Sequence, residues 1–331
     1  MFFHYYILEG DFCGDYTISY FSFIDYCSNT PYHSKGGQIF DDYIKPKECL
    51  YIKGIFVILV LLSHFSGYVE LSDSFADRSF ILLRGYLGQF IVTMFFFYSG
   101  YGIYESLKHK GKQYVINFPK KRLLATWISF AICVTAFLIE GLLMGNSYQP
   151  KTVLLSYIGW DSIGNSNWFV FVTFGIYVIF FGVYIFAKNT QALKWLLSFT
   201  ILVVLFSVAL FFFKENNWWD TAICFPLGMW FSRYKTQTEE YIKKKYHGIV
   251  LFIAVVIGFL LLFYAGAKYS HVFYPISACL FCIIVVMLTM KIKIRNPILA
   301  FFGKHVFSIY MLQRLWYIPF SKLNMNCYLF F

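Results

Sequence analysis

Long apolar runs recur along the chain from Lys53 onward, and each is close to the length that an α-helix needs to cross the hydrocarbon core of a bilayer. The runs lack the alternation of polar and apolar positions that a membrane β-barrel requires, so helices are expected. The pattern predicts an all-α, polytopic membrane helix bundle of about nine spans. The expected spans are Lys53–Val69, Gly85–Tyr104, Leu123–Met144, Trp168–Ala187, Trp195–Phe213, Trp218–Phe231, Ile249–Ala267, Val272–Met290 and Ile298–Pro319.

The segment before the first run has a different character. Residues 1–49 are polar, rich in tyrosine and hold five aspartates. The first residues lack the basic stretch followed by an apolar stretch that marks a secretory signal. We therefore expect two regions, an extramembrane leader over residues 1–49 and a membrane domain over residues 50–331.

Composition supports the membrane class and excludes others. The chain is 59% hydrophobic and only 14% charged, with a mean hydropathy of +0.60. An ordinary soluble domain is about 25% charged, so a water-soluble enzyme is not expected, and a disordered chain is excluded.

The net charge of +11 comes from 28 Lys and Arg against 17 Asp and Glu. If Lys304, near the start of the last expected span, is counted with the segment before that span, twenty of these 28 basic residues fall on one side of the expected spans. Six fall on the other side, and Lys53 and Arg314 lie within spans. Cytoplasmic loops of membrane proteins accumulate Lys and Arg. The charge therefore predicts a multi-pass protein of the inner or plasma membrane with a cytoplasmic N-terminus, and no nucleic-acid partner.

The eight cysteines do not suggest a metal centre. Cys133, Cys224, Cys279 and Cys282 lie inside apolar runs, where a thiol behaves as a small hydrophobic group. The remaining cysteines and histidines do not have the spacing of a zinc site. No metal is expected.

Two ionisable residues in the first expected span are the sharpest candidates for chemistry, because such residues are costly at membrane depth. Lys53 and His64 are eleven positions apart, so they share one stripe of a helix, roughly 16 Å apart along its axis. We expect Lys53 near the cytoplasmic surface and His64 well inside the membrane. Lys53 either extends to the headgroups or binds a ligand. His64 either bonds another helix or takes and returns a proton.

Three further groups have both a structural and a functional interpretation. Ser99 and Gly100 are small enough to let helices approach closely. The basic cluster that ends in Lys121 and Arg122 lies at the cytoplasmic start of an expected helix, where it can bind phosphates of a cofactor or of lipids. Tyr310 and Gln313 share a helix face and either orient an acceptor hydroxyl or bond between helices.

Six motifs occur in an order that resembles membrane acyltransferase family 3, which includes O-acetylases of surface polysaccharides. Lys53 replaces the arginine that usually opens the family's first helix, and Gln313 stands where many members have a second histidine. The motifs are Lys53-Gly54 with His64, the Phe-rich run ending at Ser99-Gly100, Phe118-Pro119-Lys120-Lys121-Arg122, Asn167-Trp168-Phe169, Leu227-Gly228-Met229, and Gly303-Lys304 followed by Ser308-Ile309-Tyr310-Met311-Leu312.

The resemblance implies an O-acyltransferase that moves an acyl group, acetyl above all, from cytoplasmic acetyl-CoA or another acyl-CoA to a hydroxyl of a cell-surface glycan or a lipid-linked sugar precursor. It implies His64 as the catalytic residue, as a general base or an acyl carrier. Donor phosphates would be held by Lys53, Lys121 and Arg122. The expected substrate or structural support comes from Ser99, Gly100, Trp168, Tyr310 and Gln313.

Two alternatives stay open. The same polar residues could line the path of a transporter or flippase for a glycan intermediate, although two halves with matching broken helices are not evident. Eighteen residues follow Gln313, whereas the family normally has a tenth helix, so an inactive, truncated family member is the second alternative.

Overall fold

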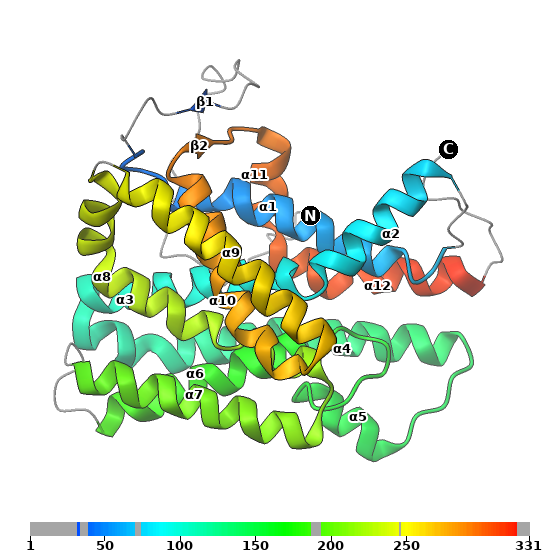
Figure 1. Ribbon diagram of the computed structural model, residues 1–331. Helices are drawn as coiled ribbons and strands as arrows, with labels where there is room; N and C mark the ends of the chain where they lie inside the picture. Colours follow the sequence, from blue (N-terminus) through cyan, green and yellow to red (C-terminus); the bar gives the residue numbers. More distant parts are fainter. Residues whose placement is uncertain (1–31, 34–38, 70–73, 187–192, 245, 323–331) are drawn as a thin grey trace.

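The computed structural model describes residues 32–33, 39–69, 74–186, 193–244 and 246–322, and in these residues the protein is an all-α helical membrane bundle (Figure 1). A single short antiparallel pair, β1 (Tyr32–His33) with β2 (Ile292–Lys293), joins the segment before the first helix to the connection that precedes α11. The helices are α1 (Pro46–Phe65), α2 (Phe75–Leu87), α3 (Phe90–Phe118), α4 (Ala125–Leu143), α5 (Pro150–Tyr157), α6 (Trp168–Phe186), α7 (Leu193–Phe213), α8 (Cys224–Lys243), α9 (His247–Lys268), α10 (Tyr274–Thr289), α11 (Pro297–Lys304) and α12 (Val306–Lys322), with the short turns η1 (Pro119–Leu124), η2 (Asn216–Trp218) and η3 (His271–Phe273).

Six helical segments of the described chain are long and apolar enough to cross a membrane, which confirms the predicted fold class. One of them, Phe90–Leu143, contains two of the nine expected spans. The loop expected between those two spans is helical instead. The chain turns at Gly111, whose φ of 53° favours glycine, and continues through η1 into α4.

Two of the nine expected spans do not form a single membrane-length apolar helix. The sixth, Trp218–Phe231, is replaced by η2 and by α8, which begins only at Cys224 and extends into a polar, Lys- and Glu-containing segment. The ninth, Ile298–Pro319, is interrupted at His305 and forms two helices, α11 and α12. An unbroken apolar run therefore marks helical structure here without fixing one straight span.

The first helix is also displaced from its predicted position. α1 begins at Pro46, a residue whose fixed φ favours the first turn of a helix, and it ends at Phe65. Lys53 consequently lies near the middle of α1 and His64 in its last turn. The expected span began at Lys53 itself, so α1 starts seven residues earlier than expected. The membrane depths of Lys53 and His64 stay predictions. The predicted leader falls largely outside the described residues, and its final residues, from Pro46 onward, belong to α1.

Glycines set two close helix crossings. A Cβ atom on Gly54 would meet the backbone of Leu299, and one on Gly303 would meet the backbone of Leu50, so α1 and α11 pack backbone to backbone. In the same way α3 crosses α8, where a Cβ on Gly100 would meet the carbonyl of Phe225. Such approaches leave room for glycine alone. They fix the position of Lys53, which directly precedes Gly54.

α2 is an amphipathic helix outside the apolar bundle (Figure 1). Ser74 caps it by accepting a hydrogen bond from the backbone of Asp77 at 3.1 Å. Phe75, Leu82 and Tyr86 are exposed on its surface. A short helix with one exposed apolar face is typical of a segment that lies in the membrane interface.

Candidate active site

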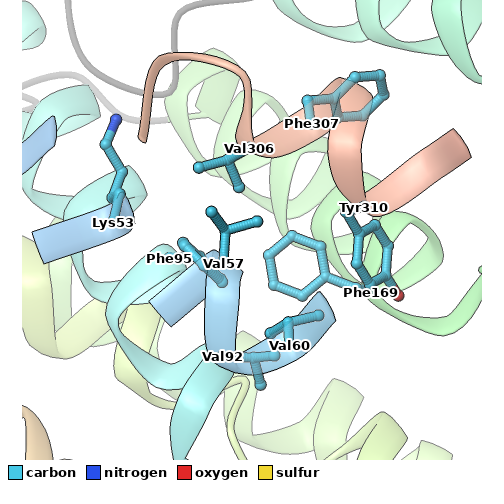
Figure 2. Close-up of a pocket in the computed structure, with 9 residues that line it drawn as sticks. All are labelled: Lys53, Val57, Val60, Val92, Phe95, Phe169, Val306, Phe307 and Tyr310. Atoms are coloured by element: carbon cyan, nitrogen blue, oxygen red, sulfur yellow. The ribbon is translucent and has the colours of Figure 1, made fainter. Parts of the chain in front are cut away.

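A narrow cavity of about 30 Å³ lies between α1, α3, α6 and α12 (Figure 2). Its walls are the side chains of Val57, Val60, Phe95 and other apolar residues, and Figure 2 shows Lys53 and Tyr310 on opposite sides of them. A volume of this size holds about two water molecules. The cavity is therefore a slot for a very small group rather than a channel.

Lys53 is the charged residue of this cavity. It is only 5% exposed, and its ammonium has no hydrogen bond or ion pair with any described residue. The Nζ atom of Lys53 is not among the fully buried polar atoms that lack a partner, and Figure 2 shows it pointing away from the apolar side chains of the cavity. A cation at this position would attract an anionic ligand. α1 can hold the lysine there because α11 packs against the glycine that follows it.

His64 contacts the last helix through a direct side-chain bond. Gln313 Nε2 lies 2.7 Å from His64 Nδ1 and also donates to the carbonyl oxygen of Tyr310 at 3.1 Å. The Tyr310 ring lies 6.1 Å from the His64 ring, measured between centroids. Because the amide nitrogen donates to a carbonyl, it also donates to Nδ1. The neutral imidazole then carries its proton on Nε2.

Four buried polar atoms beside this pair make no hydrogen bond of good geometry in the described structure: Tyr310 Oη, Ser166 Oγ, Gln313 Oε1 and Arg314 Nε. The Tyr310 hydroxyl lies close to the side chain of Ser166 and the backbone of Phe169. Buried polar atoms nearly always have a partner, so a group of exceptions indicates a place where substrate or water completes the bonding.

Ser166 was not predicted from the sequence. It lies in the polar segment that leads into α6, and a serine in such a segment is most simply part of a loop. Its importance comes from its position beside Tyr310, which is far away in the sequence. Arg314 directly follows Gln313 in the sequence.

Trp168 begins α6 and packs against Phe169, with 5.7 Å between the ring centroids. Phe169 lines the cavity and contacts the Tyr310 ring at 5.7 Å. Trp168 thus supports a wall of the cavity without facing it. Its predicted role in substrate or structural support stays a prediction.

The remaining predicted residues lie elsewhere. Lys121 is exposed and Arg122 half-buried on η1, and neither lines the cavity that holds Lys53. Ser99 donates to the carbonyl of Phe95 at 2.7 Å, and Gly100 lies at the crossing of α3 with α8. The structure therefore brings together Lys53 with Tyr310, and His64 with Gln313, and leaves the η1 cations apart from both.

No cluster of three or more metal-ligating side chains occurs among the residues that the structure describes. A protein-family model described as an acyltransferase domain matches residues 50–327. Neither a curated protein nor a solved structure matches the chain.

Proposed function

Because the chain belongs to acyltransferase family 3, and is a membrane acyltransferase by that membership, we propose that it moves a short acyl group from acyl-CoA to a hydroxyl of a cell-surface glycan or its lipid-linked precursor. The observation that carries the proposal is the group of unsatisfied polar atoms around His64, next to a cavity that Lys53 and Tyr310 line.

Lys53 would bind an anionic part of the donor. Its ammonium has three N–H donors and no hydrogen bond to a described residue, so a phosphate group would accept hydrogen bonds from it. Lys121 and Arg122 would attract the same donor from the surface of η1, where at least one of them is exposed. The small cavity between Lys53 and Tyr310 favours acetyl over longer acyl groups.

His64 would handle the proton of the acceptor. The hydroxyl oxygen attacks the thioester carbonyl, a carbon–oxygen bond forms, and the carbon–sulfur bond breaks. The proton leaves the hydroxyl for His64 and then passes to the departing sulfur. Tyr310 and Ser166, whose hydroxyls lie close together, would donate hydrogen bonds to the oxygen that becomes negative on the way.

The contact with Gln313 sets a condition on this step. With the amide nitrogen on Nδ1, the proton of the ring is on Nε2, which cannot then accept another. A half-turn of the amide lets Oε1 accept from Nδ1–H and leaves Nε2 free as a base. That turn gives up the bond to the Tyr310 carbonyl, which is worth about 1 kcal/mol.

The direct test is acyl transfer by membranes that contain the protein. Membranes from cells that make the chain, supplied with labelled acetyl-CoA, should label a glycan fraction, and membranes from cells without it should not. Labelling that does not depend on the protein would contradict the proposed function. Comparison with Lys53→Met membranes, matched for protein level, then tests the donor site.

A further inference from the structure

A second hollow of about 560 Å³ lies beside the segment that connects α5 to α6, and we call it the loop pocket. The connecting segment contributes Trp160, Asp161 and Asn167 to it, and the end of α7 with η2 contributes Phe213, Lys214 and Trp218. The loop pocket is an open hollow at the surface and is much larger than the cavity at Lys53.

The two tryptophan rings of the loop pocket contact a cation. Trp218 is only 7% exposed, and Trp160 is half-buried. The ammonium of Lys214 lies 3.9 Å from the ring centroid of Trp160 and 4.4 Å from that of Trp218. The rings therefore hold a cation at the wall of the pocket.

The loop pocket has both hydrogen-bond donors and hydrogen-bond acceptors that no bond to a described residue uses. Lys214 donates to the carbonyl of Trp160 at 2.7 Å, which uses one of its three N–H donors, and no other hydrogen bond to a described residue uses the rest. Asp161 accepts from the backbone of Ser162 at 2.8 Å with one carboxylate oxygen. Asn167 donates to the carbonyl of Asp161 at 2.9 Å, which leaves its own side-chain oxygen as an acceptor.

The charges in the loop pocket select the type of ligand. Asp161 and Glu215 place two carboxylates around the single cation of Lys214, so the pocket carries a net negative charge. An anionic lipid headgroup or acidic sugar would be repelled. Exposed aromatic rings such as that of Phe213, combined with both donors and acceptors, suit an uncharged polyhydroxy ring.

The connecting segment is held in a defined shape before any ligand arrives. Ser162 Oγ donates to the carbonyl of Asn165 at 2.7 Å and accepts from the backbone of Gly164 at 3.1 Å. The backbone of Ile163 donates to the Asn165 side chain at 3.1 Å. A preformed binding loop loses little conformational entropy when it binds.

The same segment reaches the candidate active site on its other side. Gly164 has a φ of 114°, and a Cβ there would lie 3.2 Å from Ile318 of α12. Two residues further on, Ser166 lies beside the Tyr310 hydroxyl. One short segment therefore lines the loop pocket with Asp161 and approaches the His64 site with Ser166.

From this geometry we propose that the loop pocket binds an uncharged sugar residue of the acceptor glycan, next to the sugar that receives the acyl group. The acceptor role rests on the proposed function, whereas binding of an uncharged sugar does not. A glycan with repeating units would place one unit in the loop pocket and present a neighbouring hydroxyl to His64.

The test is direct binding to the purified full chain in detergent, with no acyl donor present. Cellobiose and N,N′-diacetylchitobiose are titrated while tryptophan fluorescence is recorded, and glucuronic acid serves as the anionic counterpart. We expect saturable binding of a neutral disaccharide. Lys214→Met and Asp161→Asn should each weaken it at least tenfold, and the second change keeps the oxygen that caps Ser162.

Lys268→Met is the matched control, because Lys268 also lies over aromatic rings, those of Tyr264 and Tyr269, at 5.4 Å from each centroid, but outside the loop pocket. It should leave binding unchanged, and equal melting temperatures of the variants show that each is folded. Absence of saturable binding, equal binding by both Lys214→Met and the control, or tighter binding of glucuronic acid would each overturn the proposal.

The two proposals fail in different ways. Sugar binding that persists in a protein without acyl transfer refutes the proposed function and leaves the loop pocket intact. Acyl transfer with no sugar binding, and with the same acceptor KM in Lys214→Met as in the unchanged protein, refutes the loop pocket alone.

Discussion

Replacing Lys53 by methionine should stabilise the protein and weaken its use of the donor. Methionine has a similar length and fills the same space among Val57, Val60 and Phe95. It replaces a charged residue that is only 5% exposed and whose ammonium has no hydrogen bond or ion pair with a described residue. Replacing a buried charge by a packed apolar side chain is often worth about 1–4 kcal/mol. In a chain of this size each kcal/mol raises the melting temperature by roughly 2–4 °C.

The same change should raise the KM for acetyl-CoA. A hydrogen bond to a charged group contributes about 1.5–3 kcal/mol, which corresponds to a rise of roughly 10- to 150-fold. The acceptor KM should stay the same. The assay measures initial rates against acetyl-CoA concentration, together with melting temperatures in detergent, for Lys53→Met, Lys53→Arg and the exposed control Lys304→Met.

Lys53→Arg keeps the charge and should retain donor use, and Lys304→Met should change neither quantity. An unchanged KM for acetyl-CoA in Lys53→Met would refute the donor role. A lower melting temperature in that variant would show that the ammonium has a stabilising partner, contrary to the account of the cavity.

Three further outcomes are expected. Gln313→Glu should raise the turnover rate several-fold, because a carboxylate accepts a hydrogen bond from His64 Nδ1–H without the amide turn that costs about 1 kcal/mol. A tenfold loss of turnover in the folded variant would count against the proposed His64 tautomer. Val57→Ala should raise the butyryl-to-acetyl ratio of kcat/KM about tenfold, because it enlarges a cavity of about 30 Å³. Competition between butyryl-CoA and acetyl-CoA measures this ratio, and an unchanged ratio would place the acyl group elsewhere. Burial raises the pKa of Asp220, in the connection before α8, to about 6, although His271 at 3.4 Å opposes the shift. The folded protein therefore holds this proton more tightly than the unfolded chain, and its stability should fall by up to about 3 kcal/mol as pH rises from about 4 to about 6. Equal slopes of melting temperature against pH in Asp220→Asn and the unchanged protein would contradict this.

The sequence predicts the class of fold well, because apolarity at membrane length is a local property of each run. It does not predict where a helix begins or ends when residues outside the apolar run decide the boundary. Pro46 starts α1 earlier than its apolar run, and helix-forming polar residues carry α8 past Phe231. α2 was missed because a search for unbroken apolar runs ignores an amphipathic helix, although Ser74 is a clear capping signal.

Sequence reasoning found the members of the candidate site but not their arrangement. His64 and Gln313 are 249 positions apart, and only the packing of α12 along α1 brings their side chains to 2.7 Å. The family resemblance groups the η1 cations with Lys53, and the fold leaves them outside the cavity that Lys53 lines. Ser166 could not be found from its own segment, since its significance depends on Tyr310.

The most direct test of the central claim is acetyl transfer by His64→Gln. Glutamine keeps a hydrogen-bonding side chain in the last turn of α1, so expression, membrane insertion and melting temperature should match those of the unchanged protein. The exposed His247→Gln serves as the control. If His64 handles the proton, acetyl incorporation at matched protein level falls by roughly a hundredfold or more in His64→Gln and not in the control. Retained activity in His64→Gln would contradict the catalytic assignment.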